Sequence, residues 1–352
     1  MSDLAVGFDA LAMVRDHVRA TGHEIGCEPA AARFVARPGD TLLKAGLAAG
    51  LPLPYECASG TCGTCKARLL EGRVDSLWPD APGLSERDQA RGDRILCCQT
   101  VPLTPCRIQV NFGEPIAKPK PQEWRAVVIE RAALTHNVIR LRLRVAEACP
   151  FLAGQFMLFK LPAGRRAYSI SNPPDAGATL EFVVKRKLAG RGSDYLFDSL
   201  AVGDDLTLEG PYGHAHLRAD SERPIVGIAG GSGLGPVWSV VQAALQCADE
   251  RPVHLFFGVN EAADLFYDDE FRALALRHPR LRVERVLLRA GVGDPAECRI
   301  GTVSQVAIQQ LDDLTGCDVY MARPSAMIDA ALRDTVLVGK AAADRVFFDR
   351  FY

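Results

Sequence analysis

The chain has no excess of charge and no long apolar run. Its 352 residues include 41 Lys and Arg against 43 Asp and Glu, a formal net charge of -2, which argues against nucleic acid as a partner. The first twenty residues carry Asp3, Asp9 and Asp16 among their apolar residues, and no apolar run of bilayer length follows. We therefore expect neither a secretion signal nor a membrane span.

Histidine is scarce and scattered, with seven in the whole chain. Neither a Ser/His/Asp arrangement nor a pair of catalytic carboxylates is evident, so acid-base hydrolysis is not the expected chemistry. Cysteine is frequent, at 11 residues. Because that number is odd and no export signal precedes it, we expect a cytosolic protein whose thiols are reduced or bound to metal.

The most informative stretch runs from Cys57 to Cys65, CASGTCGTC, with cysteines at 57, 62 and 65 and a further one at Cys98. The spacing C-x4-C-x2-C with a distant fourth cysteine is typical of plant-type [2Fe-2S] ferredoxins. Thiolates are soft ligands for iron-sulfur clusters or zinc, and Gly60 and Gly63 let the loop curl closely around a cluster. A structural zinc site usually pairs two short C-x2-C hooks, and disulfides need an oxidising compartment, so both alternatives are less favoured.

The fourth ligand is ambiguous because Cys97 and Cys98 are adjacent. Successive residues of a strand face opposite sides, so only one of them can readily point at the cluster. The pair Cys98-Gln99 resembles the ligand position of ferredoxin domains in oxygenase reductases, where the ligand directly precedes Gln. That resemblance implies Cys98 as the ligand and Cys97 as a buried neighbour.

The periodicity around this loop predicts a β-grasp domain. We expect a short amphipathic helix in residues 1–20, two strands between His23 and Ala36, a turn at 37–40 and a helix over 41–49 capped by Asp40 or Thr41. Residues 66–74 predict a hairpin strand and turn. The proline-rich segment GEPIAKPKPQ then predicts an extended linker. We divide the chain into an N-terminal extension (1–25), a ferredoxin domain (26–112), the linker (113–122) and two further domains (123–222 and 223–352).

The domain 123–222 reads as an antiparallel β-barrel, with strand candidates WRAVVIE, RLRLRV, GQFMLFKL and TLEFVVKR separated by turn residues. Its stretch Arg166-Ala-Tyr168-Ser169 resembles the R-x-Y-S flavin motif of the ferredoxin-NADP reductase superfamily. The resemblance implies that Arg166 holds the FAD pyrophosphate, Tyr168 lies against the flavin ring and Ser169 sits near flavin N5, with Tyr168 and Ser169 as the catalytic pair. A guanidinium pairs bidentately with phosphate, and an aromatic face packs on a flat ring, so the residue types suit these roles.

Two further features of that superfamily follow in order. Gly190-Arg-Gly192-Ser193 matches a turn into a helix whose amides face the flavin pyrophosphate. The turn Gly210-Pro-Tyr-Gly213 matches the one that usually closes the flavin domain. We assign Gly192 and Ser193 to the cofactor site, together with Val184 and Lys185 at the end of the strand TLEFVVKR.

The domain 223–352 alternates strand and helix patterns, which predicts a parallel sheet covered on both faces. Its first strand leads into Gly230-Gly-Ser-Gly-Leu-Gly-Pro236, which is not the G-x-G-x-x-G fingerprint. It resembles the GG(T/S)G-x-x-P nucleotide loop of the same superfamily. The resemblance assigns the nucleotide pyrophosphate to a set of small residues and a proline, namely Gly230, Gly231, Ser232, Gly233 and Pro236.

The third domain departs from the superfamily in two places. The usual C-G-x-x-x-M motif appears as Ala322-Arg323 followed by Met327, so the thiol near the nicotinamide is absent while the Met is kept. Where many relatives carry an Arg, this chain has Asn260-Glu261. Glu261 could accept hydrogen bonds from a ribose 2′-OH and would repel a 2′-phosphate, which favours NADH over NADPH. A C-terminal aromatic, Phe351 or Tyr352, is expected against the flavin, although a final core strand accounts equally well for the neighbouring aromatics.

The resemblance covers nearly the whole chain after residue 25 and matches the one-chain reductase components of bacterial multicomponent oxygenases. It implies that hydride from NAD(P)H reaches FAD, and that single electrons then pass through a [2Fe-2S] cluster to the terminal component of a Rieske dioxygenase or a diiron monooxygenase. The flavin must stand between the other two centres because NAD(P)H gives two electrons at once and the cluster accepts one. We expect a monomer. The alternatives are the reductase partner of a sugar-deoxygenating dehydratase and, from another class, a zinc or redox-sensing module without turnover.

Overall fold

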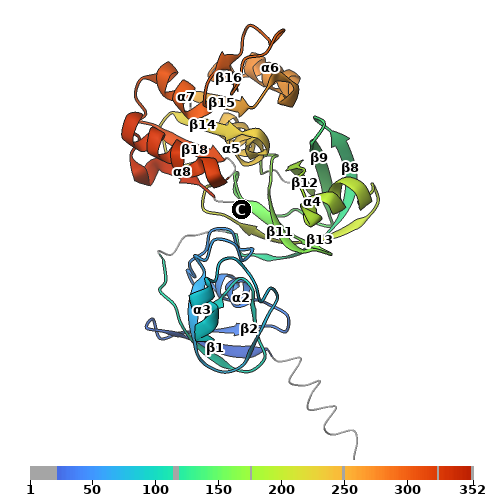
Figure 1. Ribbon diagram of the computed structural model, residues 1–352, viewed down its shortest axis with the longest axis vertical. Coiled ribbons are helices and arrows are strands. Elements are labelled where there is room, and N and C mark those ends of the chain that lie inside the picture. Colours follow the sequence, from blue (N-terminus) through green and yellow to red (C-terminus); the bar gives the residue numbers. More distant parts are fainter. Residues whose placement is uncertain (1–21, 114–118, 175–176, 248–249, 323–324, 350–352) are drawn as a thin grey trace, which may run out of the picture. The chain divides into compact units, whose positions relative to one another are not determined.

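The computed structural model describes residues 22–113, 119–174, 177–247, 250–322 and 325–349. The chain divides into two compact units, Met1–Gln122 and Glu123–Tyr352 (Figure 1). The helix expected in residues 1–20 lies outside the described residues. Among the helices that the model describes, none is both long and apolar enough to span a bilayer.

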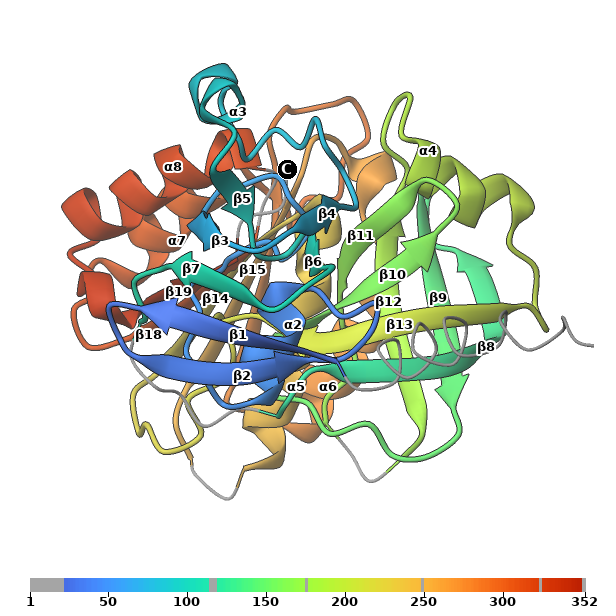
Figure 2. The ribbon, with the colours of Figure 1, turned by 90° about the horizontal axis from the view of Figure 1, so that it is seen from below.

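The first unit is built on a mixed five-stranded sheet. The strand order is β2-β1-β7-β3-β5, with β1 antiparallel to β2 and parallel to β7 (Figure 2). This is the β-grasp arrangement that the sequence predicts. The strands are β1 (His23–Glu28), β2 (Ala32–Ala36), β3 (Lys66–Glu71), β5 (Arg94–Leu96) and β7 (Cys106–Gln109), and a small second sheet joins β4 (Val74–Ser76) to β6 (Thr100–Pro102).

Two helices complete this unit. In α2 (Leu42–Ala48) the side chain of Thr41 accepts a hydrogen bond from the Lys44 amide, so Thr41 is the N-cap and the expected helix is confirmed. In α3 (Glu86–Arg91) Ser85 and Asp88 form a reciprocal capping box. Between α2 and β3 the chain has no regular structure, and this irregular segment contains the three closely spaced cysteines.

The second unit begins with a six-stranded antiparallel sheet in the order β11-β10-β13-β8-β9-β12. A bridge between Ile170 and Phe182 connects the end of β11 to β12, the two edge strands, and so curls the sheet into a half-barrel. The alternation in RLRLRV is confirmed, since the apolar residues of β9 are buried and the arginines between them are not. The strands are β8 (Gln122–Ala133), β9 (Val138–Val145), β10 (Phe156–Leu161), β11 (Gly164–Ser169), β12 (Thr179–Lys185) and β13 (Asp205–Tyr212), and the helix α4 (Arg191–Asp194) follows β12.

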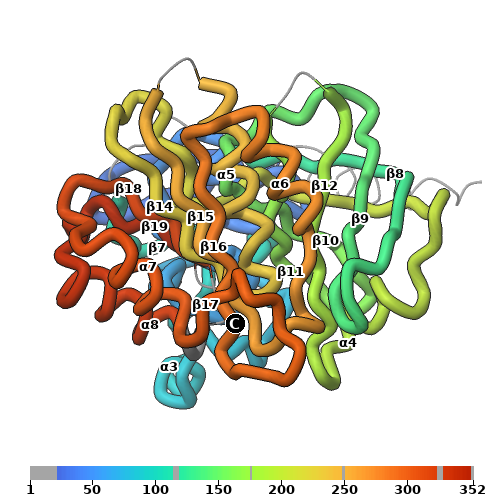
Figure 3. The backbone as a smooth tube through the Cα atoms, turned by 90° about the horizontal axis from the view of Figure 1, so that it is seen from above, coloured from blue at the N-terminus to red at the C-terminus, as the bar shows by residue number. Residues whose placement is uncertain are grey.

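A parallel sheet forms the rest of the second unit, in the order β17-β16-β15-β14-β18-β19 (Figure 3). The reversal of strand order beside β14 creates a crevice at the carboxyl ends of the strands, where ligands of such sheets bind. The strands are β14 (Ile225–Gly230), β15 (Val253–Val259), β16 (Leu281–Leu287), β17 (Arg299–Ile300), β18 (Asp318–Ala322) and β19 (Val346–Phe348). The helices are α5 (Leu234–Gln246), α6 (Asp268–Arg277), α7 (Val303–Leu311) and α8 (Ser325–Arg333).

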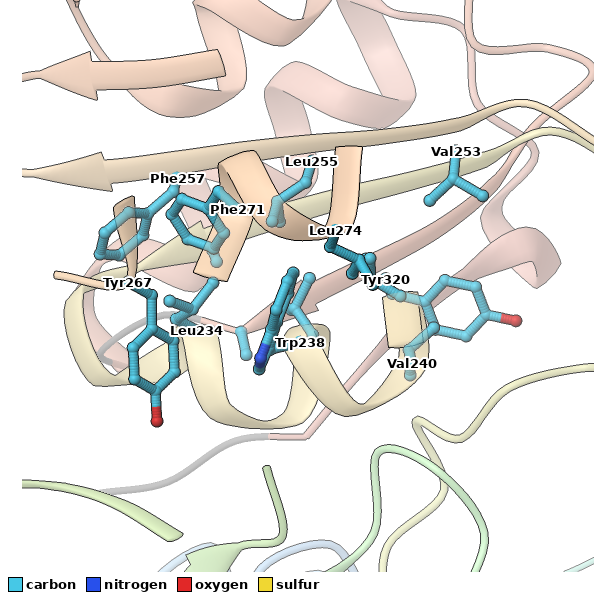
Figure 4. Packing of buried hydrophobic residues seen from close by; sticks show 14 of the residues in the cluster. Leu234, Trp238, Val240, Val253, Leu255, Phe257, Tyr267, Phe271, Leu274 and Tyr320 are labelled. Atoms are coloured by element: carbon cyan, nitrogen blue, oxygen red, sulfur yellow. The ribbon is translucent and has the colours of Figure 1, made fainter. Parts of the chain in front are cut away.

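Each face of the parallel sheet has its own core. Residues of α5 and α6 pack on one face with an aromatic centre, where the rings of Trp238 and Phe271 lie 5.2 Å apart edge to face (Figure 4). Residues of α7 and α8 pack on the other face. Helix α5 also joins the sheet to the half-barrel, because Ser239 Oγ donates to the carbonyl of Asn172 at 2.7 Å and Gln242 Nε2 donates to the carbonyl of Ser171 at 3.0 Å.

Candidate functional site

The cysteine loop brings its thiols together in pairs. The sulfur atoms of Cys65 and Cys98 lie 3.2 Å apart. Cys57 accepts hydrogen bonds from the amides of Ser59 and Cys62, each at 3.4 Å. The pKa of Cys57 is lowered despite its burial. The hydrogen bond with the Cys62 thiol contributes most, and the Thr61 hydroxyl and the two amides add to it. The thiolate, the form that binds metal, is therefore favoured at Cys57, while the same contact raises the pKa of Cys62.

The pairing of the thiols suits a cluster of two irons. Among the described residues, no three His, Cys, Asp or Glu side chains gather closely enough to hold one metal ion. Two pairs of thiols are what a two-iron cluster needs, with two ligands on each iron. All eleven cysteines have free thiols. The side chain of Cys97 is buried beside the pair, and its amide donates to the Cys65 carbonyl at 3.0 Å.

Backbone contacts hold the cysteine loop in a tight curl. The amide of Gly83 donates to the carbonyl of Gly60 at 2.9 Å, which ties the segment after β4 to the loop. A Cβ atom on Gly63, whose φ is +78°, would lie 2.7 Å from the carbonyl oxygen of Gly83. Only glycine fits at this close approach. Gly63 and the Gly83–Gly60 hydrogen bond therefore fix the curl of the cysteine loop.

In the half-barrel the R-x-Y-S motif lies on the edge strand β11. Arg166 crosses the start of α4, because a Cβ atom on Gly192 would lie 3.0 Å from Arg166 Cγ. Two motifs that are 26 residues apart in the sequence thus come together in space. Tyr168 packs on Phe159 with ring centres 4.7 Å apart, and burial raises the pKa of Tyr168 to about 12, so its hydroxyl keeps its proton at neutral pH.

Helix α4 starts at a glycine with no side-chain cap on its first amides. Ser193 shapes the turn before the helix, because its Oγ accepts from the Lys187 amide at 3.0 Å and donates to the Gly190 carbonyl at 2.8 Å. That hydroxyl is therefore engaged with backbone groups. The amides of residues 191–193, at the positive end of the helix, are the groups that would face an anion.

A cavity of about 150 Å³ opens at the carboxyl ends of β14, β15 and β16. The glycine loop contributes Gly230, Gly231 and Ser232, and the half-barrel contributes Lys185. Asn260 and Asp264 also line the cavity, while Glu261 between them is exposed and is not part of the lining. Asp264, on the short turn Ala262–Asp264, places a second acidic residue at this wall, and the role of Glu261 stays a prediction.

The glycine loop also contacts the end of the R-x-Y-S strand. A Cβ atom on Gly235 would lie 3.8 Å from the Ser169 carbonyl oxygen and 3.7 Å from Ser171 Cβ. Pro236 follows in the first turn of α5, as expected, and lines a separate cavity of about 10 Å³ with Ala322 and Asp349. This second cavity adjoins the position where the superfamily carries its thiol.

Three family models match the chain in consecutive segments. They are the 2Fe-2S iron-sulfur cluster binding domain at residues 26–103, the oxidoreductase FAD-binding domain at 125–217 and the oxidoreductase NAD-binding domain at 228–333. The ferredoxin–NAD(+) reductase component of an alkene monooxygenase system from Xanthobacter autotrophicus is 46% identical to this chain, over 90% of the chain and 97% of the relative. The chain belongs to the ferredoxin–NAD(P)⁺ reductase family.

Two further proteins are similar to the reductase over most of their length. The solved structure of a ferredoxin reductase in carbazole 1,9a-dioxygenase covers 94% of the reductase and 98% of its own chain, with a TM-score of 0.85 and 34% identity. A CDP-6-deoxy-L-threo-D-glycero-4-hexulose-3-dehydrase reductase from Yersinia pseudotuberculosis is 32% identical over 92% of the reductase and 96% of the relative. The reductase uses a [2Fe-2S] cluster, FAD and a nicotinamide nucleotide, and moves electrons from NAD(P)H through FAD and the cluster.

The residues of the reductase fit these groups. The paired thiols suit iron, and the buried Thr61 hydroxyl, although close to Cys57, makes no hydrogen bond of ordinary geometry with any described residue. The uncapped start of α4 beside Arg166 suits a phosphate. The side chain of Val184 is fully buried in the half-barrel core, so any contact of that residue with a cofactor would come from its backbone.

Several expected site residues cannot be placed. Phe351 lies outside the described residues, as do Arg323 and the side chain of Met327 on α8. The structure adds residues that motif reading missed, namely Asn137, Asp264 and Thr302 at the larger cavity and Thr61 and Gln99 at the cysteine loop. Their sequence signal is weak, because short turns and single polar side chains have no periodicity to identify them.

Proposed function

We propose that this reductase takes hydride from NADH and delivers single electrons through its [2Fe-2S] cluster to the electron-accepting protein of a bacterial oxygenase system. When bound, FAD accepts two electrons as hydride and releases them one at a time, and the cluster carries one. The observation that carries the proposal is the contact between the glycine loop at Gly235 and the Ser169 end of the R-x-Y-S strand. That contact joins the wall of a nucleotide pocket to the wall of a flavin pocket.

In this proposal each motif has one physical task. Cys57, Cys62, Cys65 and Cys98 hold the cluster. Arg166 and the first amides of α4, including that of Gly192, bind the FAD pyrophosphate. Tyr168 presents a neutral aromatic ring to the flavin, and Ser169 lies at the reacting edge. The loop from Gly230 to Gly233 binds the nucleotide pyrophosphate, and Lys185 reaches the same cavity from the half-barrel.

The acceptor is proposed to be an oxygenase-system component rather than a sugar dehydratase. Relatives of both kinds match over most of the chain, but the alkene monooxygenase relative is 46% identical and the dehydrase relative 32% identical. The test is the NADH-dependent rate of electron delivery to a purified monooxygenase ferredoxin, compared with a purified sugar 3-dehydrase. Faster turnover with the dehydrase at equal concentration would contradict the proposal.

The preference for NADH is proposed to depend on Asp264. Its carboxylate lies in the cavity wall, where it would repel a 2′-phosphate and accept hydrogen bonds from a 2′-hydroxyl. We expect Asp264→Asn to raise kcat/KM for NADPH by about tenfold, because like charges in contact cost more than 1.4 kcal/mol. The matched control is Glu261→Gln, which removes the same charge from an exposed neighbour. An equal gain in both variants would show that net charge, and not Asp264, sets the preference.

We also propose that the reductase works as a monomer in the cytoplasm. None of its eleven cysteines forms a disulfide, which suits a reducing compartment. Light scattering of the purified holoenzyme measures the oligomeric state directly.

A further inference from the structure

We infer that two side chains, Thr61 and Gln99, donate hydrogen bonds to the sulfur atoms of the iron-sulfur centre and raise its reduction potential. This inference rests on the proposed ligand set Cys57, Cys62, Cys65 and Cys98. It goes beyond that set because neither Thr61 nor Gln99 binds iron.

The first observation is the hydroxyl of Thr61. The Oγ1 atom is buried, yet it makes no hydrogen bond of ordinary geometry with any residue that the structure describes. A buried hydroxyl without a partner is costly, so natural proteins rarely leave one. Thr61 lies between two of the proposed ligands, directly before Cys62 and four residues after Cys57. A sulfur atom of the cluster or of its ligands is the acceptor that would satisfy it.

The second observation is the side-chain amide of Gln99. Its side chain is 4% exposed, and Nε2 lies 3.7 Å from the sulfur of Cys98, within donor range for sulfur. The side chain is held against the cysteine loop, because a Cβ atom on Gly60 would lie 3.0 Å from Gln99 Cγ. The backbone of Gln99 is fixed as well, since its carbonyl accepts from the Leu77 amide at 2.8 Å. The side-chain amide is thus held facing the sulfur of Cys98.

Both donors act in the same direction. Reduction adds one electron, and therefore one negative charge, to a centre whose sulfur atoms carry much of the charge. A donor aimed at sulfur stabilises the reduced form more than the oxidised form, so it raises the potential. Because the Thr61 hydroxyl and the Gln99 side chain are shielded from water, solvent does not readily replace either donor when it is removed.

The experiment is a redox titration of the full-length holoenzyme, with the cluster followed by electron paramagnetic resonance. We compare Thr61→Val and Gln99→Met with the parent. Each variant keeps the shape of the side chain and removes the donor. Each is expected to make reduction of the cluster about three- to tenfold less favourable, and tenfold is 59 mV for a one-electron couple. The flavin potentials of the same samples should not change.

Two further variants separate this effect from damage to the loop. Thr61→Ser keeps the hydroxyl and should keep the parent potential. Ser59→Ala removes a hydroxyl from the same loop but keeps the backbone amide that donates to Cys57, so the potential should also stay. If Thr61→Val lowers cluster occupancy, the resonance still reports only the molecules that carry the cluster.

Parent potentials in both donor-removing variants, at measurable cluster content, would overturn the inference and leave the proposed function intact. An equal fall in Ser59→Ala would also overturn it. A parent protein that carries no [2Fe-2S] cluster would instead overturn the proposed ligand set.

Discussion

Replacing Cys98 by Ala is expected to abolish the iron-sulfur centre of the reductase while NADH still reduces the flavin. The sulfur of Cys98 lies 3.2 Å from that of Cys65, and Cys98 is only 1% exposed, so water has little access to replace the missing ligand. Loss of one ligand leaves one iron with a single thiolate. The measurements are iron and sulfide content, and the rates with ferricyanide, which accepts electrons from flavin, and with cytochrome c. We expect the cytochrome c rate to fall to background and the ferricyanide rate to persist.

Cys97→Ala is the matched control for this prediction. Cys97 has the same chemistry, the same 1% exposure and an adjacent position, and its backbone contacts to Cys65 and Leu43 do not involve the thiol. It should keep the cluster with at most a modest loss of stability, because only a small buried group is removed. If Cys97→Ala loses the cluster and Cys98→Ala keeps it, the ligand assignment is wrong.

The second large effect is expected for Arg166→Met, which should weaken FAD binding by about tenfold to a hundredfold. Arg166 packs on Gly192 at the uncapped start of α4, so its guanidinium and the helix amides would converge on one phosphate group. A charge-assisted hydrogen bond is worth about 1.5–3 kcal/mol, which sets the size of the loss. The measurement is the dissociation constant for FAD of the flavin-depleted protein, followed by quenching of flavin fluorescence.

The control for Arg166 is Arg144→Met, which removes one positive charge from an exposed position on β9 of the same half-barrel. It should leave FAD affinity within a factor of two or so of the parent, because an isolated surface charge contributes little. If Arg166→Met binds FAD as tightly as the parent, the guanidinium does not bind the pyrophosphate, and the helix amides alone hold it.

Much of the fold follows from local pattern. The alternation in RLRLRV predicts β9 because a half-buried strand repeats every two residues, and the structure buries Leu141, Leu143 and Val145 as that pattern requires. Thr41 predicts the start of α2 because a hydroxyl can satisfy a free amide there. The alternation of strands and helices after residue 223 predicts a parallel sheet, because two neighbouring parallel strands must be joined by a crossover connection, usually a helix.

The candidate site was harder to predict in detail. Motifs identify which loops carry it, but not which side chain of an irregular turn points inward. Glu261 and Asp264 illustrate this limit, because both are acidic and only Asp264 lines the cavity. Val184 illustrates another, since alternation in β12 places its side chain in the core. Thr61 and Gln99 become visible only when burial is known, because nothing in their spacing marks them as donors.

The central claim is that one chain relays electrons from NADH through FAD to a [2Fe-2S] cluster. Anaerobic titration of the purified holoenzyme with NADH, followed by visible absorbance, tests it most directly. The account predicts bleaching of both flavin and iron-sulfur bands, at about three electrons per chain, two for FAD and one for the cluster. A flavin that neither NADH nor NADPH bleaches would contradict it, and would locate the failure at the nucleotide site around Ala322.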